Sequence, residues 1–235
     1  MNNINPIAII LARGGSKEIP NKNLETINNK SLLEITVNQI KKSINTEVFV
    51  SSDADNILNE AVNLGCIPIK RPSNLSEDNS SSEDAIIHSI EYIEKNIGED
   101  FNTIIFPQLT SPLRNYQDFK EALLLYAQEN YDSLFSSNEA LDYLLWKQDK
   151  SGQFIELNFD NKNRKPRQEK ELQLIENGSF YIFDKNKFKE YRIRLFDSIG
   201  EYRMEPWQLF EIDNLEDLEL CRQISKIKNS DGIYG

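Results

Sequence analysis

The chain has 235 residues, of which 39% are hydrophobic and 28% are charged, and this balance is typical of a globular protein rather than a disordered one. Its formal net charge of −11 argues against a nucleic-acid-binding surface, because phosphate backbones are bound by basic faces. A small nucleotide substrate is not excluded, since a pocket can be locally basic on an acidic protein. Cys66 and Cys221 have no metal-binding spacing, so we expect two free buried thiols.

The N-terminal region carries no membrane or secretory signal. Its apolar run, residues 7–12, is much shorter than the roughly 20 residues that cross a bilayer. No basic segment with a cleavage site accompanies this run. We therefore expect a cytoplasmic protein that does not contact a membrane.

Strand-like and helix-like segments alternate through the first half of the chain. Continuous apolar runs, typical of strands buried on both faces, lie at residues 7–12, 47–52, 66–69 and 103–106. Helical periodicity covers residues 32–42, 54–64, 82–96 and 116–128. This alternation predicts one α/β domain over residues 1–235, built on a mostly parallel, doubly wound, Rossmann-like sheet. Ligands of such sheets bind beyond the carboxyl ends of the strands, so the loops after Ala12, Ser52 and Phe106 should line one cleft.

Residues 138–176 depart from this pattern. The stretch is polar, with scattered aromatic residues and a basic cluster at residues 162–167. A structureless stretch of this length is uncommon inside a compact domain. We expect a small hairpin excursion that packs on a partner subunit, followed by a strand at residues 180–183 and a closing helix at residues 215–227.

The loop after the first strand has the composition of an anion-binding loop. Gly14 and Gly15 allow backbone N–H groups to turn toward an anion, and Arg13, Lys17 and Lys22 place three cations near the same point. The loop matches neither the Walker A pattern nor G-x-G-x-x-G, which weakens the ATPase and dinucleotide interpretations. Taken alone, the loop is equally compatible with a solvated turn.

Four ordered blocks of sequence sharpen this interpretation. The first is Leu11 to Asn23 (LARGGSKEIPNKN), and the second is Arg71 to Leu75, followed by Asp78 and Ser82. The third is Gln108 to Arg114 (QLTSPLR). The fourth comprises Arg167-Gln168, Glu176-Asn177-Gly178 and Glu211-Ile212-Asp213. Together the blocks closely resemble those of the CMP-sialic acid synthetases, or acylneuraminate cytidylyltransferases.

The resemblance implies a reaction and its site. CMP would be transferred from CTP to a sialic-acid-like 2-keto-3-deoxy acidic sugar, releasing pyrophosphate, in a homodimer that uses Mg²⁺. The implied nucleotide contacts are Leu11, Ala12, Arg13, Gly14, Ser16, Lys17, Lys22, Asn23, Arg71 and Ser82. The implied sugar contacts are Gln108, Arg167 and Gln168, and the implied metal ligands are Glu211 and Asp213. Arg13, Lys17 and Asp213 would act in catalysis.

Each of these residues also has an ordinary structural interpretation. Ser82 is a possible helix N-cap, as are its neighbours Ser80 and Ser81. Arg71 would pair with the α-phosphate or fix the base, and Lys22 is equally readable as a surface lysine. Arg167 either reaches across a dimer to the sugar carboxylate or belongs to a solvated charge run.

Glu211 and Asp213 would point to one face if they lie in a strand, where they could hold Mg²⁺. Their competing interpretation is the start of the C-terminal helix, with Asp213-Asn214 as its cap. His88, the only histidine in the chain, is expected to pack on its helix.

Three departures from the family pattern bear on function. Glu18 stands where the family usually has glycine, Leu109 replaces a proline, and Glu211 replaces an aspartate. They leave open whether the sugar is N-acetylneuraminic, legionaminic, pseudaminic or octulosonic acid. Two other reactions are alternatives, those of a sugar-1-phosphate nucleotidyltransferase and of a glycosyltransferase on a similar sheet. Glu18 also makes a non-catalytic CTP-binding relative an alternative.

Overall fold

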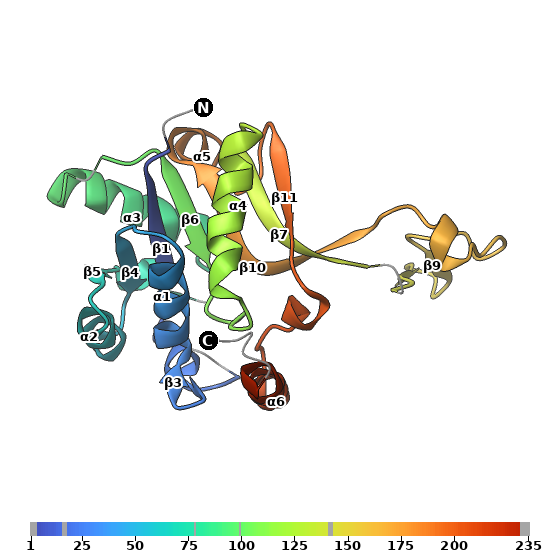
Figure 1. Cartoon of the computed structure of the whole chain (residues 1–235), viewed down its shortest axis with the longest axis horizontal. Coiled ribbons are helices and arrows are strands. Elements are labelled where there is room, and N and C mark those ends of the chain that lie inside the picture. The colour runs from blue at the N-terminus through green and yellow to red at the C-terminus, as the bar shows by residue number, and fades with distance from the viewer. Residues whose placement is uncertain (1–3, 16–17, 78, 99, 141–142, 231–235) are drawn as a thin grey trace.

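Seven strands form one central sheet in the computed structural model (Figure 1), in the order β11-β7-β10-β6-β1-β4-β5. The structure describes residues 4–15, 18–77, 79–98, 100–140 and 143–230. The strands are β1 (Pro6–Leu11), β4 (Val48–Ser52), β5 (Ile67–Lys70), β6 (Thr103–Pro107), β7 (Ser133–Glu139), β10 (Leu174–Asp184) and β11 (Ile199–Arg203). Strand β1 pairs in parallel with β4 and β6, and β4 pairs in parallel with β5. Strand β10 runs antiparallel to both of its neighbours, β6 and β7. The pairs formed by β1, β4, β5 and β6 are parallel, so the sheet is mostly parallel, as predicted.

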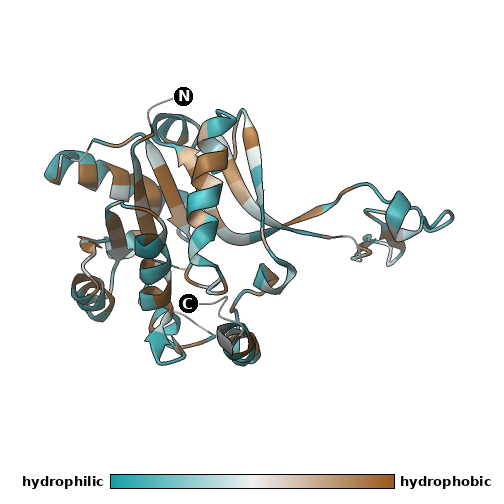
Figure 2. Ribbon diagram, viewed as in Figure 1, coloured by the Kyte–Doolittle hydropathy of each residue, from teal (hydrophilic) through white to brown (hydrophobic). Residues whose placement is uncertain are grey.

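Helices cover both faces of this sheet, which confirms the doubly wound α/β class. They are α1 (Leu32–Ser43), α2 (Asp55–Asn63), α3 (Ser82–Asn96), α4 (Tyr116–Gln128), α5 (Lys185–Tyr191) and α6 (Leu215–Ser230). One buried cluster joins α1 and α4 to side chains such as Ile10 and Phe180. A second cluster on the opposite face joins α3 and α5 to Ile9 and Phe183. Figure 2 shows the hydrophobic strands between these helices.

Strand β7, strand β11 and helix α5 were not predicted from the sequence. Strand β7 (SLFSSNE) looks polar, yet three of its serines are fully buried. Ser133 donates a hydrogen bond to the carbonyl of Phe196, and the single hydroxyl hydrogen of Ser136 lies within reach of the carbonyl of Phe180 and of Asn177 Oδ1. Buried hydroxyls are tolerated when they are hydrogen-bonded, so a serine-rich segment forms a central strand here.

An arm leaves the body of the molecule between β7 and β10 (Figure 1). Strand β10 continues antiparallel to β7 as far as the pair Leu174 and Glu139, and the chain between them projects outward. The arm carries a two-stranded hairpin of β8 (Trp146–Gln148) and β9 (Phe154–Glu156). It lies within the excursion expected at residues 138–176, and its hairpin was part of that expectation.

Smaller elements complete the chain. Strands β2 (Thr26–Ile27) and β3 (Lys30–Ser31) pair before α1. Short 3-10 helices are η1 (Lys22–Leu24), η2 (Ser73–Leu75), η3 (Arg167–Glu169) and η4 (Pro206–Leu209). Both cysteines are free and buried, as predicted. Within the described ranges, no helix combines the length and the apolar character needed to cross a membrane.

Candidate active site

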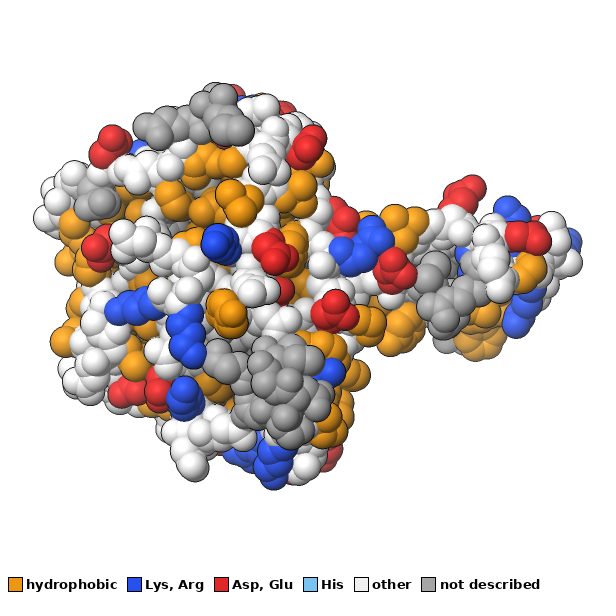
Figure 3. All heavy atoms as spheres, in the orientation of Figure 1, with side chains coloured by type: hydrophobic (Ala, Val, Ile, Leu, Met, Phe, Trp, Pro, Cys, Tyr) orange, Lys and Arg blue, Asp and Glu red, His pale blue; other side chains and the backbone are white. Residues whose placement is uncertain are grey.

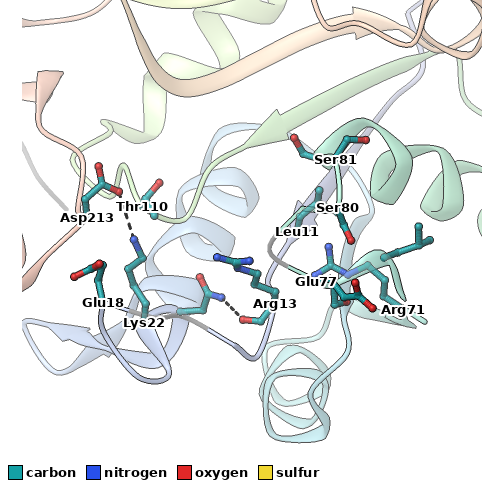
Figure 4. Close-up of a pocket in the computed structure, with 14 residues that line it drawn as sticks. Leu11, Arg13, Glu18, Lys22, Arg71, Glu77, Ser80, Ser81, Thr110 and Asp213 are labelled. Atoms are coloured by element: carbon teal, nitrogen blue, oxygen red, sulfur yellow. Dashed lines mark hydrogen bonds and ion pairs between the residues drawn. The ribbon is translucent and has the colours of Figure 1, made fainter. Parts of the chain in front are cut away.

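A cavity of about 610 Å³ opens at the carboxyl ends of the parallel strands (Figure 4). That volume lies in the usual range of small-molecule sites. Four segments far apart in sequence line it: the loop after β1, the segment from the end of β5 to α3, the loop after β6 and the segment before α6. The lining residues are Leu11, Arg13, Glu18, Lys22, Asn23, Arg71, Leu75, Ser76, Glu77, Ser80, Ser81, Ser82, Thr110 and Asp213.

The loop after β1 is fixed by contacts with its own neighbourhood. The Gly14 N–H donates to Asp53 Oδ1 at 2.8 Å, and Asn23 Nδ2 donates to the carbonyl of Arg13 at 2.9 Å. A Cβ on Gly14 would lie 2.6 Å from the Cβ of Ala54, so a larger residue has no space there. Asn23 therefore positions the backbone of this loop. The predicted contacts Ser16 and Lys17 lie outside the described residues.

Arg71 is a buried arginine that lines the cavity. The residue is only 5% exposed, and its Nε and Nη2 are buried without a hydrogen-bond partner among the described residues. Burial lowers the pKa of the guanidinium, and nearby Arg13 lowers it further, while Asp53 opposes both. A buried donor without a partner costs about 1–3 kcal/mol, so the folded chain carries this cost at a residue of the cavity wall.

Lys22 joins the first loop to the segment before α6. Its Nζ donates to the carbonyl of Ile212 at 2.7 Å and lies 3.6 Å from Asp213 Oδ1. Figure 4 shows Lys22, Glu18 and Asp213 on one side of the cavity and Arg71 on the other. The lysine side chain is 15% exposed, so it is a partly buried tether rather than a surface residue.

The segment Glu211-Ile212-Asp213 is not a strand, which corrects that part of the sequence interpretation. It is irregular chain between η4 and α6, yet Ile212 is buried while Glu211 and Asp213 are exposed on either side. The Ile212 N–H donates to the carbonyl of Thr110 at 2.7 Å, and the Thr110 hydroxyl donates to Glu211 Oε1 at 2.7 Å. These contacts hold the segment against the loop after β6.

Helix α6 is capped by Asn214, one of the two residues of the predicted Asp213-Asn214 cap, together with the carboxylate of Asp217. Asn214 Oδ1 accepts from the N–H of Asp217, and the Asp217 carboxylate accepts from the N–H groups of Asp213 and Asn214. The Asp213 carboxylate is thus not the cap and stands beside Lys22 in the cavity. Among the described residues, no group of three or more acidic, histidine or cysteine side chains could hold a metal ion. Any metal site here would rest on carboxylates completed by a ligand.

Gln108 and Glu211 meet at a backbone bulge in β10. Gly178 has a φ of +64°, where the pairing of β10 with β7 shifts register. A Cβ on Gly178 would lie 3.6 Å from Glu211 Oε2 and 3.8 Å from Gln108 Nε2. These are ordinary van der Waals distances, so glycine is required here for the left-handed turn and not for space.

Arg114 supports Gln108 through a hydrogen bond to its backbone. Sequence reasoning did not identify Arg114 as a functional residue. The residue is 1% exposed, and its Nη1 donates to the carbonyls of Gln108 and Ser179 at 2.9 and 3.0 Å. Its Nε and Nη2 donate to Gln39 and Thr36 of α1. The guanidinium thus ties the ends of β6 and β10 to α1. Arginine at the end of the third sequence block was the only available signal.

Ser82 lies on the cavity wall, but it is not the N-cap of α3. The cap is Ser81, whose hydroxyl accepts from the N–H of Asp84 at 3.0 Å. The Ser82 hydroxyl instead accepts a hydrogen bond from Arg194, in the segment between α5 and β11. No sequence signal linked Arg194 to this site, because 112 residues separate the two partners.

The three predicted sugar contacts, Gln108, Arg167 and Gln168, are not among the residues that line this cavity. Arg167 and Gln168 belong to η3 of the arm, so the structure does not bring them to Gln108 within one chain.

His88 is partly buried in α3, and burial and nearby Arg71 lower its pKa.

The comparisons with known proteins identify the family. The cytidylyltransferase family model matches residues 7–233, so the chain belongs to the cytidylyltransferase family. It is 35% identical over 180 residues to the N-acylneuraminate cytidylyltransferase of Oncorhynchus mykiss, covering 75% of this chain and 40% of that protein. It is 26% identical over 229 residues to the pseudaminic acid cytidylyltransferase of Campylobacter jejuni subsp. jejuni serotype O:23/36, covering 95% of this chain and 97% of that protein.

The relatives differ in length. The chain spans 40% of the Oncorhynchus mykiss protein and 47% of N-acylneuraminate cytidylyltransferase A from Danio rerio.

Among solved structures, a CMP:2-keto-3-deoxy-manno-octonic acid synthetase complexed with CTP superimposes with a TM-score of 0.68 at 14% identity, covering 95% of this chain and 99% of that chain. A 4-diphosphocytidyl-2C-methyl-D-erythritol synthase from Anaerococcus prevotii gives 0.64 at 12% identity, with 95% and 99% coverage. These structural likenesses establish the fold.

Proposed function

We propose that this chain transfers CMP from CTP to the anomeric hydroxyl of a sialic-acid-like 2-keto-3-deoxy acidic sugar. The observation that carries the proposal is a cavity at the carboxyl ends of the parallel strands that is lined by three basic residues, Arg13, Lys22 and buried Arg71. Cationic side chains that converge on one cavity suit a ligand rich in acceptor oxygens, as a nucleoside triphosphate is. Membership of the cytidylyltransferase family selects CTP among such ligands.

The chemistry is an in-line displacement. The anomeric oxygen of the sugar forms a bond to the α-phosphorus and its hydroxyl proton passes to solvent. The bond between the α-phosphorus and the oxygen that bridges to the β-phosphorus breaks, and pyrophosphate carries away the electron pair. Arg13 and Lys22 line the phosphate side of the cavity, and we assign Lys17 to the same task from its place in the loop. Fixed cations stabilise the charge that develops on the phosphates, and this is the main protein contribution to such transfers.

Glu211 and Asp213 fit a magnesium ion. Both offer hard carboxylate oxygens, and Mg²⁺ is usually held by one or two carboxylates together with water and substrate phosphates. The carboxylate of Asp213 is 76% exposed and lines the cavity, so it can reach a phosphate-bound ion. When bound, the ion would offset negative charge on the phosphates.

The acceptor would lie beside Gln108, across from the nucleotide. The amide of Gln108 provides both a donor and an acceptor for sugar hydroxyl or acyl groups. The named relatives act on N-acylneuraminate and on pseudaminic acid, so the acceptor class we propose is a nine-carbon acidic sugar. Such a reaction draws on the CTP pool and fits a cytoplasmic enzyme with reduced cysteines.

The arm completes the site in a dimer under this proposal. Its side chains include exposed hydrophobic residues, among them Leu145 at 52%, Phe154 at 68% and Leu157 at 59%. Figure 3 shows hydrophobic and basic side chains together on the projecting arm. Exposed apolar clusters of this kind are typical of protein–protein contacts. We infer that the arm packs on a second copy and carries Arg167 and Gln168 toward the neighbouring acceptor site.

Pyrophosphate release tests the reaction. Wild-type protein with Mg²⁺ should release pyrophosphate from CTP with one acid of a panel of N-acetylneuraminic, legionaminic, pseudaminic and octulosonic acids. ATP, GTP and sugar 1-phosphates serve as controls. Asp213→Ala should lower kcat at least about 100-fold with an unchanged circular dichroism spectrum, because it removes a metal ligand. CTP binding without release for any acid would contradict the proposal and favour a non-catalytic role.

Sedimentation tests the dimer. Phe154→Asp should convert a dimer to monomers, since it places a charge in an apolar contact. Val62→Asp on α2, which is 54% exposed and far from the arm, is the matched control and should leave the mass unchanged. A wild-type monomer at micromolar concentration would refute the dimer.

A further inference from the structure

The hydroxyl of Ser82 is engaged from behind by two charged side chains. Its oxygen accepts a hydrogen bond from Arg194 Nη2, and its hydrogen is donated to Glu83 Oε2 at 3.3 Å. A serine hydroxyl has one hydrogen and two lone pairs. While both contacts persist, Ser82 can offer only a lone pair to a ligand in the cavity. The residue therefore acts as a hydrogen-bond acceptor.

Packing and hydrogen bonds hold Arg194 in the position from which it orients the Ser82 hydroxyl. Its guanidinium lies over the rings of Phe106 and Tyr181, with its Cζ 5.2 and 5.0 Å from their centroids. These two residues are paired across β6 and β10, and both are almost fully buried. Arg194 Nε also donates to Glu83 Oε1 at 2.9 Å. One guanidinium therefore fixes both the oxygen of Ser82 and the carboxylate that takes its hydrogen.

The same cavity is also lined by Arg71, whose guanidinium can only donate hydrogen bonds, whereas Ser82 is held as an acceptor. A 4-amino pyrimidine presents a donor at C4 and acceptors at N3 and O2. A 4-oxo pyrimidine presents an acceptor at C4 and a donor at N3. A fixed acceptor at Ser82 together with an arginine donor in one cavity complements the first pattern, and the fixed acceptor opposes the second.

We propose that Arg194 and Glu83 are positioning residues that orient the Ser82 hydroxyl, so that the cavity selects 4-amino over 4-oxo pyrimidine nucleotides. The inference rests on the proposed function, in that the cavity is taken as the nucleotide site. It deepens that function by naming the groups that set the base preference. Sites with fixed hydrogen-bonding groups reject the wrong ligand strongly, because mismatched groups are left unpaired.

Calorimetric binding of CTP and UTP to the full chain with Mg²⁺ tests the inference without any sugar. Wild type should bind CTP at least about tenfold more tightly than UTP. Arg194→Ala should reduce this ratio about five- to tenfold, the effect of one hydrogen bond. Ser82→Ala should do the same, and the double variant should lose no more than Ser82→Ala alone, because Arg194 acts through Ser82. Glu83→Gln, which preserves side-chain shape, should lower the ratio even if Arg194→Ala fails to fold.

Arg192→Ala is the matched control. Arg192 lies two residues from Arg194 and pairs with Asp84 in the same turn of α3 at 3.2 Å, so its loss should leave the ratio unchanged. The proposal is overturned if wild type binds both nucleotides equally. It is also overturned if Arg194→Ala and Glu83→Gln leave the ratio constant, or if the Ser82 and Arg194 losses are additive. A chain that prefers CTP as described but releases no pyrophosphate retains this inference and loses the proposed function.

Discussion

Two buried arginines lie beyond the carboxyl ends of the strands, and they differ in how far the folded chain satisfies their hydrogen-bond donors. Arg71 follows β5 and keeps Nε and Nη2 without a hydrogen-bond partner among the described residues, on the wall of the cavity. Arg114 follows β6 and donates from all three nitrogens to Gln39, Thr36, Gln108 and Ser179. Both are at most 5% exposed, so burial alone does not separate them.

The difference indicates which buried charge serves the fold and which serves a ligand. The region around Arg114 is closed, because the folded chain already satisfies the guanidinium and the carbonyls that receive it. The region around Arg71 differs, because its Nε and Nη2 have no partner among the described residues and the residue lines the cavity. Substitutions at the two positions should therefore affect different measurements.

The largest effect is expected at Arg114. Arg114→Met leaves the buried carbonyls of Gln108 and Ser179 without this donor, which should cost about 3 kcal/mol of unfolding free energy. Urea denaturation followed by circular dichroism measures the loss. Arg203→Met, which removes partly exposed ion pairs to Glu139 and Glu201, should cost less than about 1 kcal/mol. Equal losses in the two variants would remove the distinction between closed and surface arginines.

At Arg71 the effect should fall on binding instead. Arg71→Met should weaken CTP binding by about 2 kcal/mol, or roughly 30-fold, while the unfolding free energy stays unchanged or rises. Stability should not fall, because the substitution removes a buried group with unsatisfied donors. Calorimetry and urea denaturation on the same sample check both statements. Lys70→Met, at the adjacent exposed position, is the control and should alter neither. A loss of stability equal to that at Arg114 would show that Arg71 also serves the fold.

A smaller effect is expected in the pH dependence of the unfolding free energy, and it concerns the region around Arg114. Asp118 packs near Arg114, and burial raises the pKa of its carboxyl to about 6, although hydrogen bonds from Gln208, Asn115 and Tyr202 oppose this. Because the folded pKa lies above the ordinary value, the protonated form favours the folded state. The associated stability is present at low pH and is lost as pH rises through about 6.

The unfolding free energy of wild type should therefore decrease from pH 5 to pH 7.5 by about 1.4 kcal/mol relative to Asp118→Asn, because one pH unit separates pH 5 from the pKa of about 6. Urea titrations of both proteins at the two pH values measure this difference. Asp55→Asn, at a position where the carboxylate is 82% exposed, should reproduce the wild-type slope. Parallel pH profiles for wild type and Asp118→Asn would contradict the raised pKa.

Local sequence signals predicted the elements of the first half closely. The bounds of α3 and α4 are the predicted ones, because serine or asparagine caps precede clear apolar periodicity in both helices. Gly65, which follows the helix predicted at residues 54–64, has the positive φ that is typical of a glycine ending a helix. Cavity-lining residues such as Arg13 and Arg71 were found through the ordered sequence blocks.

Features that depend on distant partners were not predictable. The serines of β7 are acceptable in a central strand only because Phe196 and Asn177 receive their hydrogen bonds. Arg194 meets Ser82 across 112 residues of sequence, and periodicity carries no information at that range. The irregular backbone at Glu211 to Asp213 likewise follows from its attachment to Thr110, which a strand pattern does not reveal.

The tether between Lys22 and the carbonyl of Ile212 also constrains how the protein is made. The two residues are 190 positions apart, so the lysine emerges from the ribosome long before its partner exists. Until residue 212 has been made, the loop after β1 lacks this anchor, even when β1, β4 and β6 have paired. This side of the cavity is therefore assembled only after residue 212 has left the ribosome, and a nascent chain should not reach the native arrangement of the cavity before then.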